Sequence, residues 1–238
     1  MLQLGEKKPI LFEILLVVLA FLAAGVFSVV GNILNLHPDL SASVGRFVVG
    51  VALLIIYRRA FSRKNPLKGL AFVLPALLFP AWNLFYNLSS GAAFGGTVFF
   101  VEAIITAIAP AVFEEVLFRG IFIYNLKKND YSDIKCLFLT AALFAVVHLT
   151  NLAGLDLVSV ALQLVYSFVI GLVLAAVYLK NGSLIQIILV HFLIDYTNRL
   201  YINPATTATT VQIILFVLLL AVEAIYAICL CGRKKHEF

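Results

Sequence analysis

The sequence predicts an all-α membrane protein, a bundle of about eight transmembrane helices whose two termini both lie in the cytoplasm. Apolar residues make up 63% of the 238-residue chain, charged residues make up 12%, and the mean hydropathy is +1.07. A soluble domain carries about 25% charged and about 45–50% apolar residues. Too few polar residues therefore remain here to cover the surface of a soluble fold.

Continuous apolar stretches supply the predicted helices, because a bilayer core about 30 Å thick needs roughly 20 apolar residues in helical form. The stretches do not alternate apolar and polar residues, which argues against a membrane barrel. Their joints are short, so residues 1–238 are expected to form a single polytopic membrane domain. In chain order the expected spans cover about 10–33, 43–60, 67–88, 96–125, 135–154, 157–179, 183–201 and 210–231.

Basic residues indicate the orientation of the chain. Of the 17 Lys and Arg residues, 14 lie before the first span, after the last span, or in every second joint between spans. The exceptions are Arg46, Arg119 and Arg199. Cytoplasmic joints are the ones enriched in Lys and Arg, so an even number of crossings with both ends inside satisfies every joint. Arg46 and Arg199 are expected close to helix ends. The same placement argues against nucleic acid as a partner, although the formal net charge is +5.

Ionisable side chains inside the predicted spans are the candidates for function, because a charge in a bilayer is costly. Most of them belong to the fourth, fifth and seventh spans. Once residues near the joints are set aside, the candidates are Glu13, Glu102, Glu114, Glu115, Arg119, His148, His191, Asp195 and Glu223.

The fourth span contains two adjacent glutamates. Glu115 and Arg119 are four residues apart, so a helix places them on one face as an ion pair. Glu114 points about 100° away and lacks that partner, which favours a chemical role. Pro110 removes a helical hydrogen bond one turn earlier and is expected to kink the helix. The alternative for the charged residues is a neutralising structural cluster.

The fifth and seventh spans each contain a histidine. His148 taken alone is typical of a satisfied interior residue. His191 and Asp195 are four residues apart and share a helix face, but Asp195 also lies four residues before Arg199 and could simply neutralise it. At 1.5 Å per residue, Glu114, His148 and His191 lie about 15–20 Å from the basic joints. Their similar depth predicts that they meet inside the membrane.

In these motifs the sequence resembles the CPBP family, which groups CAAX prenyl proteases with bacteriocin-processing and immunity proteins and is also called the Abi family. The family motifs EExxxR, FxxxH and HxxxN or HxxxD correspond here to Glu114-Glu115-x-x-x-Arg119, Phe144-x-x-x-His148 and His191-x-x-x-Asp195. The resemblance covers residues 96–201, and the expected number of helices agrees with it.

The resemblance implies hydrolysis of a peptide bond within the membrane. Glu114 would be the general base that activates water, with assistance from His148. His191 and Asp195 would stabilise the oxyanion, and Glu115 with Arg119 would hold the geometry. An ionised Asp195 cannot donate a hydrogen bond, so it is either protonated or serves to orient and charge His191; we favour the second role.

No cofactor is expected. Zinc held by Glu114, His148 and His191 is the alternative, since two histidines and a glutamate form a known catalytic zinc set. The HExxH spacing of such sites is absent.

The sequence thus favours an intramembrane endopeptidase that acts at the cytoplasmic side on a membrane-associated peptide or lipidated protein, in a bacterial cell membrane. Two alternatives from other classes remain. One is a non-catalytic scaffold or immunity protein, and the other is a proton-coupled carrier, because chains of acidic and histidine residues also mark proton paths.

Overall fold

The computed structural model describes residues 7–61, 67–204 and 207–232, and nearly all of the ordered structure in them is helical. One isolated bridge, between Phe94 and Tyr201, ties the loop before α5 to the segment after α9. The helices are α2 (Pro9–Ile33), α3 (Pro38–Ile56), η1 (Leu70–Phe72), η2 (Pro75–Leu77), α4 (Leu78–Ser89), α5 (Thr97–Glu114), η3 (Glu115–Phe122), α6 (Ile123–Lys128), α7 (Asp133–Val146), η4 (Val147–Ala153), α8 (Leu157–Asn181), α9 (Leu184–Asn198) and α10 (Thr210–Gly232).

The predicted all-α fold is confirmed. Segments α5, η3 and α6 form one continuous helix, as do α7 and η4, so the described residues contain eight helical rods. Six of these rods are long and apolar enough to cross a membrane. The two short rods are α4, with 12 residues, and α9, with 15 residues.

The third and seventh rods differ from the expected spans. The third was predicted as a helix over 67–88, but its first half is broken into the 3₁₀ turns η1 and η2. Gly69 has a left-handed φ of 72° and Pro75 lacks an N–H, and both features interrupt a regular helix. The seventh ends at Asn198, because the chain then turns to reach the bridge at Tyr201.

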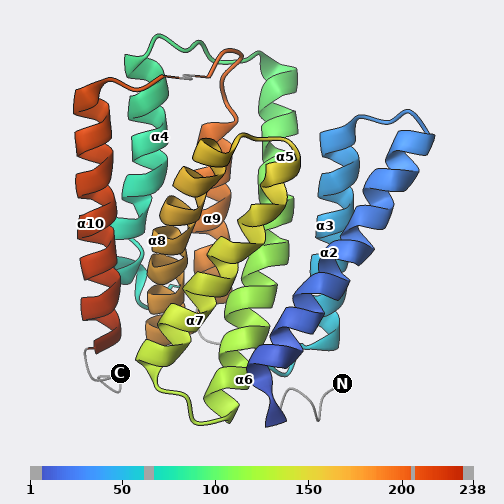
Figure 1. Cartoon of the computed structure of the whole chain (residues 1–238), viewed down its shortest axis with the longest axis vertical. Helices are drawn as coiled ribbons and strands as arrows, with labels where there is room; N and C mark the ends of the chain where they lie inside the picture. Colours follow the sequence, from blue (N-terminus) through green and yellow to red (C-terminus); the bar gives the residue numbers. More distant parts are fainter. Residues whose placement is uncertain (1–6, 62–66, 205–206, 233–238) are drawn as a thin grey trace.

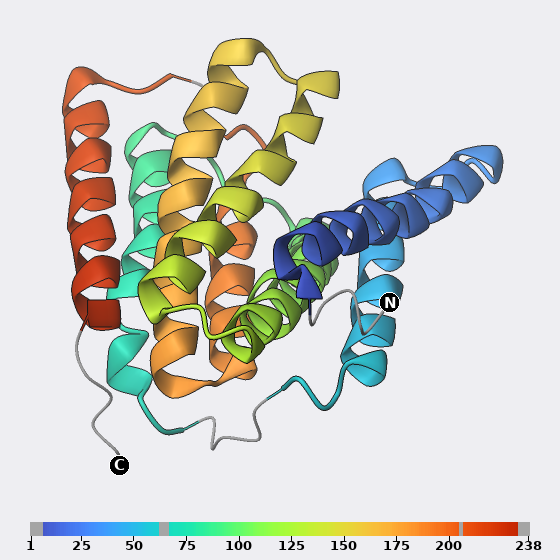
Figure 2. The ribbon, with the colours of Figure 1, turned by 60° about the horizontal axis from the view of Figure 1, so that its bottom comes forward.

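The helices form a bundle with two distinct flanks (Figures 1 and 2). α2 and α3 pair on one flank, α10 lies on the other beside α4 and α8, and α5, α7, α8 and α9 fill the middle. α2 begins and α10 ends at the same end of the bundle (Figure 1). We call this the basic end, because α6 and α8 end there (Figure 1) with Lys127 and Lys128, and with Lys180, in their last turns, and we call the other the far end. That the basic end faces the cytoplasm remains a prediction.

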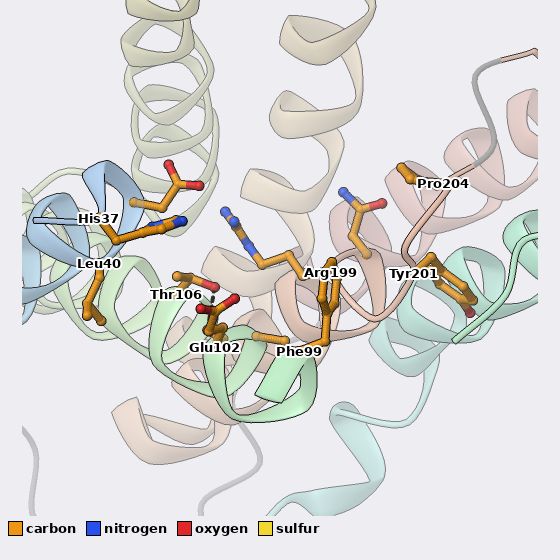
Figure 3. Close-up of a pocket in the computed structure, with 11 residues that line it drawn as sticks. His37, Leu40, Phe99, Glu102, Thr106, Arg199, Tyr201 and Pro204 are labelled. Carbon is orange, nitrogen blue, oxygen red and sulfur yellow. Dashed lines mark hydrogen bonds between the residues drawn. The ribbon is translucent and has the colours of Figure 1, made fainter. Parts of the chain in front are cut away.

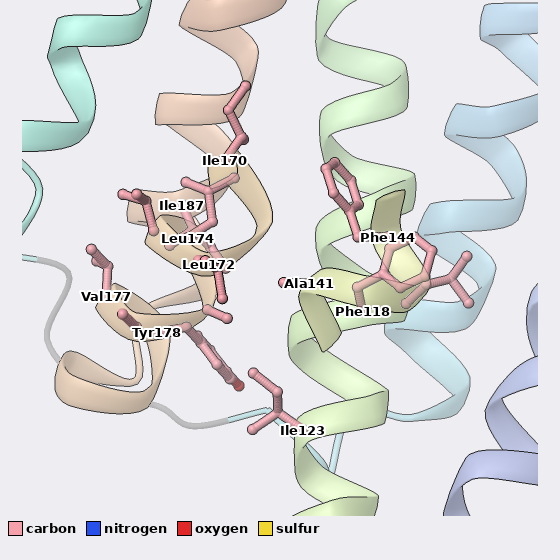
Figure 4. Packing of buried hydrophobic residues seen from close by; sticks show 14 of the residues in the cluster. Phe118, Ile123, Ala141, Phe144, Ile170, Leu172, Leu174, Val177, Tyr178 and Ile187 are labelled. Atoms are coloured by element: carbon pink, nitrogen blue, oxygen red, sulfur yellow. The ribbon is translucent and has the colours of Figure 1, made fainter. Parts of the chain in front are cut away.

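An apolar core occupies the half of the bundle toward the basic end. Figure 4 shows Phe118 of η3 near Ala141 of α7, with Leu172 and Leu174 of α8 and Ile187 of α9 packed across from them. All five side chains are buried. By contrast, long apolar side chains stand exposed over the outer surfaces of α2 and α10. This outward-facing apolar surface is the one that lipid would cover.

Candidate active site

The two glutamates lie where the long fourth helix changes its geometry. α5 ends at Glu114, and the chain continues from Glu115 to Phe122 as a π-helical segment. Pro110 lies inside α5, and the helix continues past it to Glu114; the kink expected there stays a prediction. π-helical turns widen a helix and are frequent at functional sites. Here the wider turn begins at Glu115, next to the candidate base Glu114.

Glu115 is the centre of a buried hydrogen-bond network. Its Oε1 accepts a hydrogen bond from Arg119 Nη1 at 2.7 Å and another from His191 Nδ1 at 2.7 Å. Arg119 and Glu115 are both fully buried, and Arg119 Nη2 also donates to the Gly171 carbonyl on α8 at 3.4 Å. The predicted Glu115–Arg119 pair is therefore present, and it ties η3 to both α8 and α9.

The bond to Glu115 determines how His191 faces the site. A carboxylate can only accept, so Nδ1 carries a proton and the second nitrogen, Nε2, is directed elsewhere. Nε2 lies 3.8 Å from Glu114 Oε2 and 3.9 Å from Asp195 Oδ2. The hydrogen bond that orients His191 thus comes from Glu115, whereas Asp195 approaches the other nitrogen beyond hydrogen-bond distance.

Phe144, the first residue of the FxxxH motif, holds the two histidines in place. Its ring meets His148 and His191 edge-on at centroid distances of 5.1 and 5.9 Å. The Arg119 guanidinium lies over the same ring, 4.3 Å from its centroid. The phenylalanine thus packs against residues of all three motifs.

His148 lies at the start of η4 and faces a polar cavity. Its Nδ1–H donates to the Phe144 carbonyl at 2.8 Å, which leaves Nε2 available as an acceptor. The cavity has a volume of about 240 Å³ and is lined by Glu114, His148, His191 and Asp195 together with Phe21, Arg46, Pro110, Val147, Thr150, Asn151, Gln163, Tyr166, Asn198 and Arg199. The predicted convergence of Glu114, His148 and His191 is therefore observed.

Arg46 is a cavity residue that the sequence analysis assigned to a helix end. α3 begins at Pro38, several residues earlier than expected, so Arg46 lies about two turns inside the helix. Its side chain is half-buried, and no hydrogen bond or ion pair involves it among the described residues. An arginine within a predicted span was the available signal, because such charges are rare without a function.

The remaining ionisable candidates lie outside this cavity. Glu102 belongs to a second cavity nearer the far end (Figure 3). Glu13 in α2 and Glu223 in α10 are fully buried, and their carboxylate oxygens have no hydrogen-bond partner within the described segments. The structure does not bring these three glutamates to the site.

The zinc alternative does not fit the arrangement of side chains. Within residues 7–61, 67–204 and 207–232, no three His, Cys, Asp or Glu side chains are grouped so that they could hold a metal ion. We therefore derive no step through a metal.

Fold and site together define a multi-pass membrane protein with a buried carboxylate–histidine cluster beside a polar cavity. Residues 96–197 match the family described as Rce1-like type II CAAX prenyl endopeptidase. This stretch contains all three motifs, so the chain carries a domain of this family of hydrolases, and the predicted resemblance is confirmed. No curated protein and no solved structure matched the chain.

Proposed function

We propose that this protein is an intramembrane endopeptidase in which Glu114 and His148 activate water and His191 stabilises the oxyanion. One observation supports this most directly. His191 is held by Glu115 on one nitrogen and turns the other toward Glu114, at the wall of a polar cavity inside an otherwise apolar bundle. A base, an orienting carboxylate and a positioned imidazole are the groups that amide hydrolysis needs.

The chemistry begins with a water molecule in the cavity. Glu114 accepts a proton from this water, and the oxygen adds to the carbonyl carbon of the scissile peptide bond. The negative charge that develops on the carbonyl oxygen is stabilised by His191, whose positive form is favoured by the Glu115 carboxylate at Nδ1. The C–N bond then breaks, and the proton taken by Glu114 passes to the leaving amine. His148, with Nε2 free, assists the water on the same wall.

Asp195 acts from the edge of this arrangement. At 3.9 Å from His191 Nε2 it adds negative charge near the ring without competing with Glu115 for Nδ1. It therefore supports the positively charged imidazole rather than donating to the oxyanion itself. Glu115 and Arg119 remain positioning residues, because both are fully buried behind His191.

The substrate class follows from the location of the site. A cavity within the membrane domain suits a peptide or lipidated protein that is itself associated with the bilayer. We propose a bacterial cell membrane as the location, with a maturing peptide or prenyl-like lipidated protein as substrate.

The test is cleavage of a quenched peptide library by the purified protein in liposomes. Glu114→Gln should lower turnover by about 10³-fold or more, because it removes the base while keeping the side-chain shape. Glu223→Gln is the matched control, since Glu223 lies on α10, which contributes no residue to either cavity, and it should leave turnover unchanged.

A chelator arm separates the remaining alternatives. We expect activity to survive chelation; loss that zinc restores would instead place Glu114, His148 and His191 in a metal site. If the wild-type protein and Glu114→Gln cleave at the same rate, Glu114 is not the base. If neither protein cleaves and a cellular phenotype persists in Glu114→Gln, the scaffold or immunity hypothesis replaces the peptidase. A proton-coupled carrier would show substrate uptake into liposomes without cleavage products.

A further inference from the structure

The catalytic cavity lies in the half of the bundle that is remote from the basic end. α7 begins at Asp133, whose carboxylate pairs with Lys127 at the basic end, and the cavity residues Thr150 and Asn151 lie at the opposite end of that rod, in η4. α9 likewise begins just after Lys180, and Asn198 and Arg199 mark its far end. Both helices therefore bring their last turns, not their first, to the cavity.

The path from the catalytic residues toward the basic end is closed. Arg119 is fully buried, and Phe118 and Ile121 of η3 belong to one apolar cluster with Leu137 of α7 and Ile187 of α9, each with no exposed surface. Figure 4 shows Phe118 and Ile187 within this cluster. A well-packed apolar core of this kind has no room for water or a peptide. Access to Glu114 must then come from another direction.

A second polar cavity continues the path toward the far end. It has a volume of about 250 Å³ and shares Asn198 and Arg199 with the catalytic cavity. Figure 3 shows Arg199 between His37 of the α2–α3 turn and Tyr201, above Glu102 and Thr106 on the first turns of α5. The two cavities together place polar side chains from the far end of the bundle down to Glu114.

The distribution of basic residues assigns a side of the membrane to this path. In the sequence, all but three of the 17 Lys and Arg residues fall in every second joint, before the first helix or after the last one, and two of those three, Arg46 and Arg199, line the catalytic cavity. Such a bias marks the basic end as cytoplasmic. We propose that the catalytic cavity opens to the non-cytoplasmic face of the membrane, and that peptide substrates reach Glu114 from that face past Arg199.

Two of the expectations drawn from the sequence cannot both hold in this structure. Cytoplasmic termini and attack at the cytoplasmic side would require the cavity to open at the basic end, whereas its lining lies toward the far end. We retain the orientation, because it depends on many residues in several joints. The substrates are then peptides presented on the outer face, a conclusion about substrate that depends on the proposed peptidase function.

Cysteine accessibility in intact bacterial cells tests the opening of the cavity independently of catalysis. The native Cys136, Cys229 and Cys231 are first replaced by alanine. Val147→Cys places a thiol in the cavity wall, Val146→Cys places one on the neighbouring exposed apolar surface, and Lys135→Cys places one at the basic end. Each variant is treated with a membrane-impermeant maleimide before and after permeabilisation.

We expect Val147→Cys to react in intact cells at least about tenfold faster than Val146→Cys, because the thiolate that reacts needs a hydrated environment. Lys135→Cys should react only after permeabilisation. The proposal is overturned if Val147→Cys also needs permeabilisation, if it reacts no faster than Val146→Cys, or if Lys135→Cys reacts in intact cells. Cysteine labelling does not require turnover. A protein without peptidase activity would therefore contradict the proposed function, while the labelling would still report the side to which the cavity opens.

Discussion

Adjacent glutamates acquire different roles because one step along the helix turns the second away from the first. Glu114 lines the cavity, whereas Glu115 is fully buried and accepts hydrogen bonds from Arg119 and His191. Its second oxygen has no partner among the described residues. Glu115 has no contact with solvent and already accepts hydrogen bonds from Arg119 and His191. Its carboxylate is therefore suited to positioning these side chains rather than to accepting a proton from water.

Replacing Glu115 should therefore affect stability, and replacing Glu114 should not. Glu115→Gln leaves Arg119 as a buried charge without its counter-ion, which is expected to cost about 3–5 kcal/mol. Glu114→Gln removes a group at the cavity wall and should change the free energy of unfolding by less than about 1 kcal/mol. Reversible unfolding of both variants in the same detergent measures the difference. Equal destabilisation by the two substitutions would show that Glu115 and Glu114 do not have these separate roles, one structural and one at the cavity wall.

Arg46 is expected to bind substrate through its guanidinium. It lines the cavity without an ion-pair partner in the described part of the chain, so a peptide carbonyl or carboxylate can occupy its donors. Arg46→Gln should raise KM by about 5–30-fold while kcat changes little, since such a contact is worth about 1–2 kcal/mol in both ground and transition state. Arg59→Gln, at an exposed position after α3, should change neither constant. A fall in kcat at unchanged KM would instead assign Arg46 to the chemical step.

At the scale of the helices, close contacts between backbones fix the site. Gly50 of α3 faces the backbone of Phe113, the residue before Glu114, and a methyl group at Gly50 would come within 2.9 Å of the Phe113 Cα. Small residues permit this approach between membrane helices. The separation of α3 and α5 therefore sets how Arg46 and Glu114 face each other across the cavity.

Gly50→Ala should push α3 away from α5. We expect a loss of about 1–3 kcal/mol in stability from overpacking, together with lower turnover as the cavity widens. Gly25→Ala is the matched control, because a methyl group at Gly25 meets no atom within 4 Å; it should be neutral or slightly stabilising, as alanine favours a helix. Thermal unfolding and peptidase assays of the two variants make the comparison, and indistinguishable variants would contradict a tight α3–α5 contact.

At the scale of the molecule, the polar groups lie inside and the apolar groups cover the outside. The cavity residues and the Glu115 network occupy the middle of the bundle, whereas residues such as Val217 and Leu218 of α10 are more than half exposed. This arrangement is stable only where lipid replaces water around the bundle. It also keeps the ionisable side chains of the candidate site apart from the hydrocarbon phase.

A charge on the outer surface should consequently impair membrane insertion. Val217 is 58% exposed and lies in the middle of α10, so Val217→Asp is expected to disfavour insertion of this helix by about 2.5–3.5 kcal/mol. Val217→Leu should insert normally. The fraction of protein that resists carbonate extraction from membranes measures the effect. Unimpaired insertion of Val217→Asp would mean that this face of α10 is in contact with water or another protein.

The sequence by itself determined the class of fold, the approximate spans and the motif residues. Long apolar runs and the spacing of basic residues are local properties, and the bilayer thickness converts them directly into helices. The predicted Glu115–Arg119 pair followed from helical spacing in the same way. The 3₁₀ turns before α4 were missed because proline and glycine do not lower hydropathy enough to reveal a broken helix.

Only the tertiary structure decided which residues meet. That His191 is oriented by Glu115 rather than by Asp195 depends on how α9 packs against η3, and the entry of Arg46 into the cavity depends on where α3 begins and how closely it approaches α5. The direction in which the cavity opens depends on where apolar side chains from four segments fill the bundle. These are contacts between residues far apart in the chain, and no local pattern of the sequence specifies them.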